Sequence, residues 1–535
     1  MFHAPEGSVI LPTRVLACRI LAAASLCLTA LSLPAVAQSD DVTLRSYDGG
    51  VSLSGTLLGF DGEFYRIDSE YGELTVDASG VSCAGVACPS LTDFVAELRI
   101  SGSDTIGRVL LPALIEGFAL REGYESSREE SGPDATLYTL TSTETERTVA
   151  RFYISSTTSD SGFADLLADE ADLVMSLREI RAEEAEAARD AGLGDLTEAK
   201  WSRVLALDAM VPVVSSQNPV ETISLRTLTD ILAGRTRNWQ ALGGPDAPVV
   251  LHLPTESSGL AQSIGDRLAR ALPEAAEGQV LRHDSQEALA ASVAVDPFGL
   301  GIASFSEIGL SKPLSVDGPC GFSLSAERGT IKTEDWPLTA PMFLYLPARR
   351  LPKLGRDFLA YTASEPAQNV IRRVGFTDQA VEDVPIAHQG SRLANAIAVA
   401  DGEEGLAELK RLRTELAPLN RLTLSFRFEP GSTQLDAQSR ANVARLAADI
   451  EAGLYDSRTM LFAGFSDGAG PASANLVIAR NRAEAVRDAV IAAAEAADPE
   501  RLDIRTDGFG EAMPMACDDT VWGRKANRRV EVWLD

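Results

Sequence analysis

The spacing of apolar residues changes along this chain, and no single fold accommodates all of its patterns. Between residues 41 and about 90, segments such as "VSLSGTLLGF" and "EFYRIDS" alternate apolar and polar residues between Gly and Asp turns, which predicts short β-strands. From residue 98 to about 375, strands alternate with amphipathic helices, which indicates an α/β domain. A charged helical stretch and a last α/β unit follow. The chain of 535 residues therefore folds as several domains.

These changes of pattern divide the chain into five segments. We expect a signal peptide over residues 1–37, a small β domain over 38–92, a large α/β domain over 93–385, a helical linker over 386–414 and a C-terminal α/β domain over 415–535. With 45% apolar and 23% charged residues, the composition is that of a folded protein rather than a disordered one. The predicted fold class is multidomain α/β with a small N-terminal β module.

The N-terminus has the features of a secretory signal peptide. Arg14 and Arg19 precede an apolar stretch over residues 20–33, and the small-residue sequence "AVA" follows at 35–37. This stretch is short for a membrane span, although a retained membrane anchor is the alternative interpretation. The sequence thus predicts an exported protein whose mature chain begins near Gln38.

Four cysteines lie beyond residue 37: Cys83, Cys88, Cys320 and Cys517. Cys83 and Cys88 enclose the short loop "CAGVAC", and an oxidising compartment favours a disulfide between them. Cys320 and Cys517 lie in different predicted domains, and the sequence leaves open whether they pair. The histidines beyond residue 37 do not stand at metal-ligand spacing, so we expect no metal site and no cofactor.

The formal net charge of -29 limits the partners of this chain. Nucleic acids and anionic membrane surfaces repel acidic proteins, so neither is expected as a ligand. The sequence has no H-E-x-x-H helix and no P-loop, and His252 near Ser257 and Ser258 fits a structural role better than a catalytic one. We therefore do not expect an enzyme, and a hydrolase is the least favoured hypothesis.

The last part of the chain resembles a known family in three segments: "FRFEPGSTQLD", "GFSDGAGPASANLVIARNRAEAV" and "GFGEAMPMACDDTVWGRKANRRVEVWL". These segments occur in order over about the last 115 residues and resemble an OmpA-like peptidoglycan-binding domain. The resemblance implies non-covalent binding to the diaminopimelate residue of the cell-wall stem peptide.

The same resemblance implies the residues of the wall-binding site. Asp467 takes the ammonium group of diaminopimelate, Arg482 takes its carboxylate, Asn475 shapes the loop and Arg528 lines the site. A zwitterion needs one anion and one planar, permanently charged donor, which an aspartate and an arginine provide. A surface pair between Asp467 and Arg482 with a purely structural role is the alternative. The sequence departs from the family at Phe465, where a His is usual.

In the middle domain, the segment "LRISGSDTIGRVLLPALIEGFALREG" places a turn rich in Gly, Ser and Thr between a strand and a helix. Such a turn presents N–H groups and hydroxyls at the positive end of a helix, which suits an oxyanion. With later segments such as "MVPVVSSQNPVETISLRTLTDILAGRTRNWQALGG" and "AVDPFGLGIASFSEI", the domain resembles the PstS-like binding proteins of phosphate ABC transporters. The resemblance implies two α/β lobes that close on an anion as a hinged clamp.

The resemblance also implies anion-binding positions, at turns or helix starts: Ser103, Thr105, Ser159, Arg178, Ser258 and Gly259. Two or three family donors are absent, because Pro254 replaces an Arg, Leu260 replaces a Thr and Leu177 stands where a Ser is usual. The loss of a charge-assisted donor typically costs about 1.5–3 kcal/mol. The sequence therefore leaves three hypotheses open for the clamp, namely phosphate binding, binding of another small ligand, and a clamp that has lost its ligand.

Together these features predict a solute-binding protein of the periplasm that is tethered to peptidoglycan near the outer membrane of a Gram-negative bacterium. Its C-terminal domain binds the diaminopimelate stem peptide, and its middle domain binds phosphate or another small anion. The expected protein partners are an ABC permease or other envelope proteins. The main alternative is a structural envelope protein with a degenerate clamp.

Overall fold

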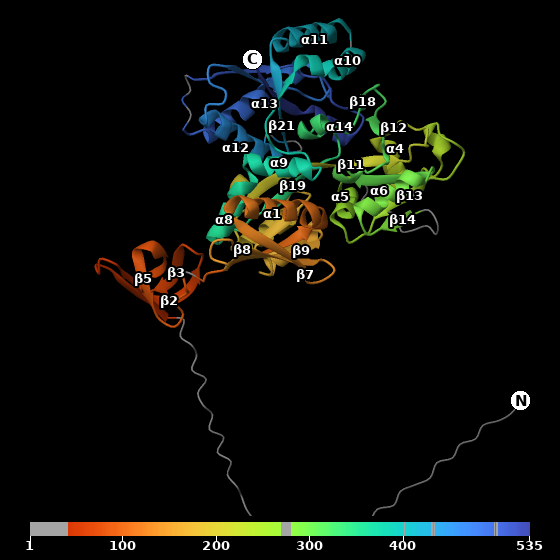
Figure 1. Ribbon diagram of the computed structural model, residues 1–535. Helices are drawn as coiled ribbons and strands as arrows, with labels where there is room; N and C mark the ends of the chain where they lie inside the picture. The colour runs from red at the N-terminus through yellow and green to blue at the C-terminus, as the bar shows by residue number, and fades with distance from the viewer. Residues whose placement is uncertain are drawn as a thin grey trace, which may run out of the picture.

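The computed structural model (Figure 1) describes residues 41–91, 93–268, 280–400, 402–429, 432, 434–496, 498 and 501–535. The predicted signal peptide lies outside these residues. Within the described ranges, no helix combines the length and the apolar character needed to cross a membrane.

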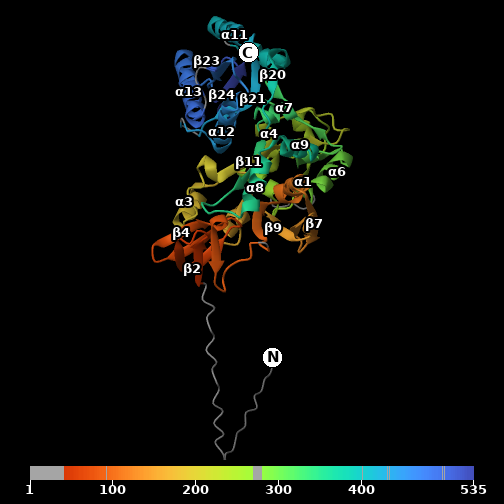
Figure 2. The same ribbon diagram turned by 60° about the vertical axis from the view of Figure 1, so that its left-hand side comes forward.

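The N-terminal module is a five-stranded antiparallel sheet with the strand order β4-β3-β2-β1-β5 (Figure 2). Its strands are β1 (Asp41–Ser46), β2 (Ser52–Phe60), β3 (Phe64–Ser69), β4 (Gly72–Asp77) and β5 (Val81–Ala84). Alternate residues of β1 and β3 form a small core of Val42, Leu44, Tyr65 and Ile67. A disulfide joins Cys83 to Cys88, as the sequence predicted. Ion pairs from Arg350 and Arg356 to Asp61 attach the module to the middle domain.

The middle domain is built on a sheet that is 11-stranded over the described residues, with the order β14-β13-β15-β11-β19-β10-β6-β9-β8-β7 and β16 paired with β11. The first lobe contains β6 (Ala96–Ser103), β7 (Tyr124–Glu130), β8 (Ala135–Ser142), β9 (Thr148–Thr157) and β10 (Leu173–Ser176). The second lobe contains β13 (Val250–Pro254), β14 (Val280–His283), β15 (Gly299–Ser304) and β16 (Lys312–Pro313), together with a small sheet of β12 (Thr222–Ser224), β17 (Ser315–Asp317) and β18 (Ser323–Leu324).

Two long antiparallel strands cross between the lobes, β11 (Ser202–Val214) and β19 (Thr339–Tyr345). The apolar core of the first lobe includes β11 residues up to Ala206, and the core of the second lobe begins at Leu207. The boundary between the lobes therefore falls inside β11.

Helices pack against both parts of this sheet (Figure 1). The first lobe has α1 (Leu111–Glu122), α2 (Ser159–Leu167), α3 (Ala182–Asp190), α8 (Lys353–Thr362) and α9 (Glu365–Arg373). The second lobe has α4 (Leu225–Leu232), α5 (Gly259–Arg267), α6 (Gln286–Val295) and α7 (Arg328–Lys332). Short helical turns are η1 (Ala78–Gly80), η2 (Ile106–Leu110), η3 (Ala199–Trp201), η4 (Trp239–Leu242), η5 (Phe305–Glu307) and η6 (Ile386–Gln389).

The C-terminal domain has a five-stranded sheet with the order β20-β21-β24-β22-β23. Its strands are β20 (Asp383–Pro385), β21 (Asn420–Arg427), β22 (Thr459–Gly464), β23 (Asp503–Gly508) and β24 (Arg529–Leu534), and its helices are α10 (Gly390–Val399), α11 (Gly402–Leu416), α12 (Ala437–Glu451), α13 (Ala472–Ala493) and α14 (Val521–Asn527). Helices α10 and α11, in the predicted linker, pack with Trp533 of this domain. Strand β20 precedes that linker yet pairs with β21.

The second lobe and the C-terminal domain are joined covalently and electrostatically. Cys320 of the lobe forms a disulfide with Cys517 of the C-terminal domain. Arg421 of β21 donates to both carboxylate oxygens of Asp335 at 2.5 and 3.1 Å, and both side chains are almost fully buried. The two domains therefore form a continuous unit.

Candidate functional site

The predicted anion-binding residues lie where the two lobes meet, and Arg178 takes part there in a separate cluster of ion pairs. Ser103 ends β6, and Thr105 lies in the following turn of the first lobe. Ser159 begins α2 in the same lobe, and Gly259 begins α5 in the second lobe. Ser258 caps α5, because its hydroxyl accepts a hydrogen bond at 3.1 Å from a backbone N–H of the first turn.

A glycine allows the lobes to approach closely at this place. A methyl group at Gly259 would come within 2.2 Å of the Oγ atom of Ser103. The turn after β6 therefore lies directly against the start of α5.

The side chain of Asp104 occupies the start of α5. Its Oδ1 atom accepts hydrogen bonds from the N–H groups of Gly259 at 2.8 Å and of Thr105 at 2.9 Å. Burial raises the pKa of the Asp104 carboxyl, although both N–H groups and the charge of Arg108 oppose the shift. The Gly259 N–H, which the sequence assigned to an oxyanion, thus donates to a carboxylate of the protein itself.

The first N–H group of α2 also donates to an acceptor on the other lobe. The N–H of Ser159 donates to the Oε1 atom of Gln262, on α5, at 3.0 Å. The Oγ atom of Ser159 accepts from the N–H of Leu177 at 3.1 Å. The Oγ atom of Ser103, in contrast, is buried and has no hydrogen-bond partner within the described residues. Ser103 therefore retains a hydroxyl donor that a bound oxyanion would satisfy.

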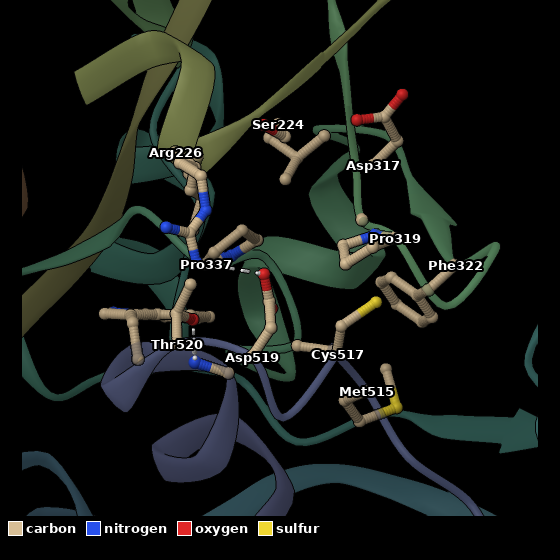
Figure 3. Close-up of a pocket in the computed structure, with 16 residues that line it drawn as sticks. Ser224, Arg226, Asp317, Pro319, Phe322, Pro337, Met515, Cys517, Asp519 and Thr520 are labelled. Carbon is tan, nitrogen blue, oxygen red and sulfur yellow. Dashed lines mark hydrogen bonds and ion pairs between the residues drawn. The ribbon is translucent and has the colours of Figure 1, made fainter. Parts of the chain in front are cut away.

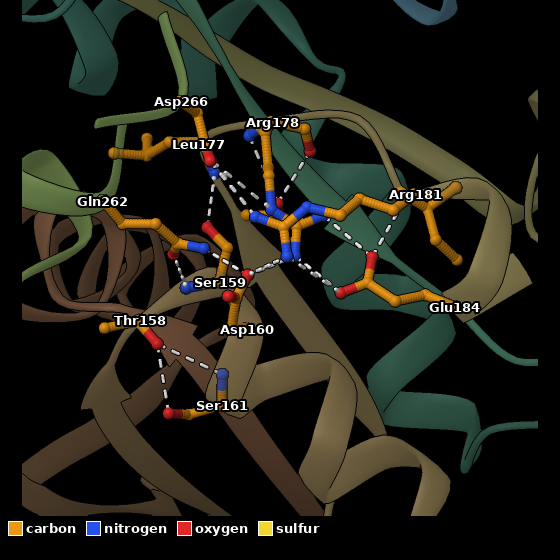
Figure 4. Close-up of polar contacts among 12 residues, drawn as sticks. Thr158, Ser159, Asp160, Ser161, Leu177, Arg178, Arg181, Glu184, Gln262 and Asp266 are labelled. Carbon is orange, nitrogen blue, oxygen red and sulfur yellow. Dashed lines mark hydrogen bonds and ion pairs between the residues drawn. The ribbon is translucent and has the colours of Figure 1, made fainter. Parts of the chain in front are cut away.

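Arg178 lies in a cluster of ion pairs that spans the two lobes (Figure 4). Its guanidinium group donates to Glu184 at 2.6 and 2.8 Å and to Asp160 at 2.5 Å. Arg181 pairs with Asp160 at 2.9 Å and with Asp266 of α5 at 3.2 Å. Carboxylates of the protein therefore already neutralise the charge of Arg178, although its buried Nε atom has no hydrogen-bond partner within the described residues.

Other carboxylates lie close to Asp104. Burial raises the pKa of Glu307, and the charges of Asp208 and Asp104 raise it further. Asp208 of β11 is buried, and its Oδ2 atom accepts a hydrogen bond from Ser304 at 2.6 Å. Burial raises the pKa of Asp208 to about 6. The surroundings of the predicted anion site are therefore acidic, which opposes the binding of a free anion.

The predicted wall-binding residues come together between β22, α13 and β24. Asp467 lies in the loop after β22, and its Oδ2 atom is 3.3 Å from the Nη1 atom of Arg528. The Oγ atom of Ser466 is buried without a hydrogen-bond partner in the described part of the chain. Asn475 is buried in the first turn of α13 and donates to Glu511 at 3.3 Å.

Arg482 of α13 is the predicted carboxylate-binding residue of this site. The Nη1 atom of Arg482 is buried and has no hydrogen-bond partner among the residues that the structure describes. Its guanidinium carbon lies 5.5 Å from the centre of the Phe428 ring. Burial and the neighbouring charge of Arg528 lower the pKa of Arg482, while Asp467 opposes this shift. The structure thus pairs Asp467 with Arg528 and leaves a charged donor of Arg482 without an internal acceptor.

A small cavity of about 40 Å³ lies between the second lobe and the C-terminal domain (Figure 3). Arg226 and Asp519, which are 3.7 Å apart, lie at its wall, and Cys517 also lines it. Its lining includes none of the predicted binding residues. We therefore assign it to the interface between the domains.

Residues 92–366, just over half of the chain, match the family model described as the PBP superfamily domain. The chain belongs to the PBP superfamily. Residues 427–528 of this PBP superfamily protein match the OmpA family model. The predicted fusion of a bilobed binding domain with an OmpA-like domain is therefore confirmed.

Individual relatives cover separate parts of this PBP superfamily protein. The phosphate-binding protein PstS of Bacillus subtilis is 29% identical over 168 residues, which are 30% of this chain and 53% of that protein. The probable lipoprotein YiaD of Escherichia coli is 35% identical over 80 residues, which are 15% of this chain and 35% of that protein. The chain thus spans about half of the first relative and about a third of the second.

A solved structure is also similar to the PBP domain. The ABC-type phosphate transport receptor of Vibrio cholerae is 20% identical and aligns with a TM-score of 0.40. The alignment covers 52% of this chain and 98% of the receptor.

The structure also shows residues that sequence reasoning missed in the PBP domain: Asp104, Gln262 and Asp266. The role of Asp104 could have been suspected from the sequence, because an acidic residue stands inside a turn that was expected to bind an anion. Gln262 and Asp266 carried none, since their role depends on how α5 faces the other lobe.

Proposed function

We propose that this protein is a periplasmic solute-binding protein held on the cell wall. The OmpA-like domain grips the diaminopimelate stem peptide of peptidoglycan, and the PBP domain takes a small oxyanion such as phosphate. The observation that carries the proposal is the buried Nη1 atom of Arg482, which has no acceptor among the described residues, beside the paired charges of Asp467 and Arg528.

The chemistry of the wall site fits one end of diaminopimelate. The carboxylate of that amino acid supplies the acceptor that Arg482 lacks, in a charge-assisted bond to a planar guanidinium group. The ammonium group of the same ligand end is placed against Asp467, which then exchanges part of its contact with Arg528. The partly buried position of the three side chains strengthens these contacts relative to those on an open surface.

In the PBP domain, one hydroxyl group and two helix N-termini support the binding of an oxyanion. Ser103 has a hydroxyl without a partner in the described residues, and the N-termini of α2 and α5 meet beside it. The Bacillus relative is named as a phosphate-binding protein. Phosphate is therefore the ligand to test first.

The junction between the domains gives the tether a physical consequence. The Cys320–Cys517 disulfide and the buried pair of Arg421 and Asp335 hold the second lobe on the OmpA-like domain. A clamp that is fixed in this way stays beside the wall instead of diffusing to a transporter. We infer a local store or sensor at the inner face of the outer membrane, with an ABC permease or another envelope protein as partner.

A second candidate is a structural envelope protein whose clamp no longer takes a ligand. The donation of the Gly259 and Ser159 N–H groups to Asp104 and Gln262 favours it. Equilibrium dialysis of the full chain against labelled phosphate separates the two candidates. Saturable uptake between micromolar and millimolar phosphate supports the solute-binding protein, and no uptake in that range supports the structural one.

Wall binding is tested by pull-down of the full chain on purified sacculi. The double variant Asp467→Arg/Arg482→Asp is expected to remain in the supernatant. The control reverses a pair further along the same helix, Arg487→Asp/Asp488→Arg, whose side chains are 2.7 Å apart and are 31% and 66% exposed. Equal recovery of the first double variant and the native chain would contradict wall binding through this site.

A further inference from the structure

The three donor groups that an oxyanion would use between the lobes of the PBP domain differ in their partners. The N–H of Gly259 donates to Asp104, the N–H of Ser159 donates to Gln262, and the hydroxyl of Ser103 has no partner within the described residues. A carboxylate oxygen and a phosphate oxygen are both anionic acceptors, and helix N-termini bind either. The start of α5 thus already holds an anionic group that belongs to the other lobe.

We propose that Asp104 is a built-in anion of the clamp, which takes the ligand's place at the start of α5 and competes with any free oxyanion for the Gly259 N–H. This inference rests on the proposed oxyanion-binding role and specifies it. Asp104 then determines the affinity of the clamp for a free oxyanion. The oxyanion has to displace the Asp104 carboxylate from the Gly259 N–H and bind close to its negative charge.

The contacts around Asp104 support this role. The Asp104 carboxylate belongs to the first lobe and accepts a hydrogen bond from the Gly259 N–H of the second lobe. This hydrogen bond holds the lobes together at the predicted ligand position. The Oγ atom of Ser103 lies so close to Gly259 that a single methyl group would not fit between them. A tetrahedral oxyanion therefore enters only if the turn that carries Asp104 moves away from α5.

The charged groups that face Asp104 do not compensate for its carboxylate. Arg108 and Asp134 lie near it in the first lobe, and they pair with each other at 2.7 Å. Glu307 faces it from the second lobe and adds negative charge. A second anion at this position would meet a net negative environment.

The test compares phosphate affinity in the full chain and in two variants, by equilibrium dialysis at pH 7.5. Asp104→Ala removes both the charge and the acceptor, and we expect its phosphate affinity to rise at least about tenfold. Asp104→Asn removes the charge alone and keeps an acceptor oxygen, so we expect a smaller rise. The control is Asp134→Ala, which removes a nearby charge that does not contact Gly259, and its affinity is expected to stay within about threefold of the native value.

Hydrogen–deuterium exchange of the same proteins gives a second readout that needs no ligand. In Asp104→Ala, the peptide that contains Gly259 is expected to exchange at least about tenfold faster, because its N–H loses its acceptor. The peptide that contains Ile154 serves as the internal reference, since its strand β9 pairs with β6 and β8 inside the first lobe.

The outcomes separate this inference from the proposed function. Tight phosphate binding by the native chain, with no gain in either Asp104 variant, overturns the inference and leaves the proposed function intact. No phosphate binding by any variant, with faster exchange at Gly259 in Asp104→Ala, supports the built-in anion and overturns the oxyanion ligand. No binding and unchanged exchange overturn both.

Discussion

The clamp and the wall site are built alike but differ in how their donors are used. Both place side chains in loops after strands and beside a helix. At the clamp, the N–H groups of Gly259 and Ser159 have protein acceptors, and Arg178 is surrounded by carboxylates. At the wall site, Arg482 has a buried donor with no acceptor in the described chain. The comparison shows that residue type alone does not identify a ligand site, because Arg178 is paired with carboxylates of the protein whereas the Nη1 atom of Arg482 has no acceptor within the described residues.

The same comparison holds for charge. Carboxylates with raised pKa values surround the clamp, whereas the wall site has Arg482 with a lowered pKa. Burial is the largest cause in each case, because it disfavours whichever form is charged. In a chain with a net charge of -29, the neighbouring arginines Arg482 and Arg528 supply local positive charge beside Asp467, which suits the carboxylate of a zwitterion.

The largest expected effect concerns Arg178. If it is a structural hub, Arg178→Gln leaves Asp160 and Glu184 without their shared cation, and the free energy of unfolding falls by about 3 kcal/mol. Urea denaturation measures the change. Arg189→Gln on the nearby α3, which loses an exposed pair with Asp195, is the control and is expected to cost less than about 0.5 kcal/mol.

Loss of phosphate affinity without loss of stability in Arg178→Gln would break the comparison. Arg178 would then be a ligand donor, as the resemblance implied, rather than part of the ion-pair cluster in Figure 4.

A smaller effect is expected from Asp208, whose pKa is raised to about 6 by burial from an ordinary value of 3.8. The folded state holds this proton more tightly than the unfolded state, so its contribution to stability is complete below pH 4 and is lost as the pH rises through about 6. In Asp208→Asn, the loss of stability between pH 4.5 and 7.5 is therefore expected to shrink by about 2 kcal/mol. Urea denaturation at both pH values measures it, and an unchanged difference would show that Asp208 titrates as an exposed carboxyl.

The smallest effect is expected at Arg528, which pairs with Asp467 at the edge of the wall site. Arg528→Gln removes one of two positive charges but leaves Arg482 in place, so we expect sacculus affinity to fall only about tenfold. A pull-down titration measures this. A loss as large as that of the Asp467→Arg/Arg482→Asp variant would mean that Arg528, and not Arg482, binds the carboxylate.

Much of the architecture was predictable from the sequence, because the periods of apolar residues and the spacing of Cys83 and Cys88 are local. The pairing of Cys320 with Cys517 was not, since 197 positions separate them and the domain interface decides it. Asp467 and Arg482 were proposed from motif positions, and the structure places the two side chains near each other. The partners of Arg178 were not predicted, because Asp160 and Glu184 lie on two different helices and Asp266 approaches from the other lobe.

The part of the clamp that depends on side-chain direction was also not predictable. The segment "SGSDTIG" does not indicate whether the Asp104 side chain points to solvent or toward α5. Its contact with Gly259 arises only when both lobes are placed.

The most direct test of the central claim is calorimetric titration of the full chain with meso-diaminopimelic acid. We expect saturable binding by the native protein and by the control Arg487→Gln, and at least about 100-fold weaker binding by Arg482→Gln, because the buried donor then has no charge. Equal affinity of Arg482→Gln and the native protein would contradict the account of the wall site.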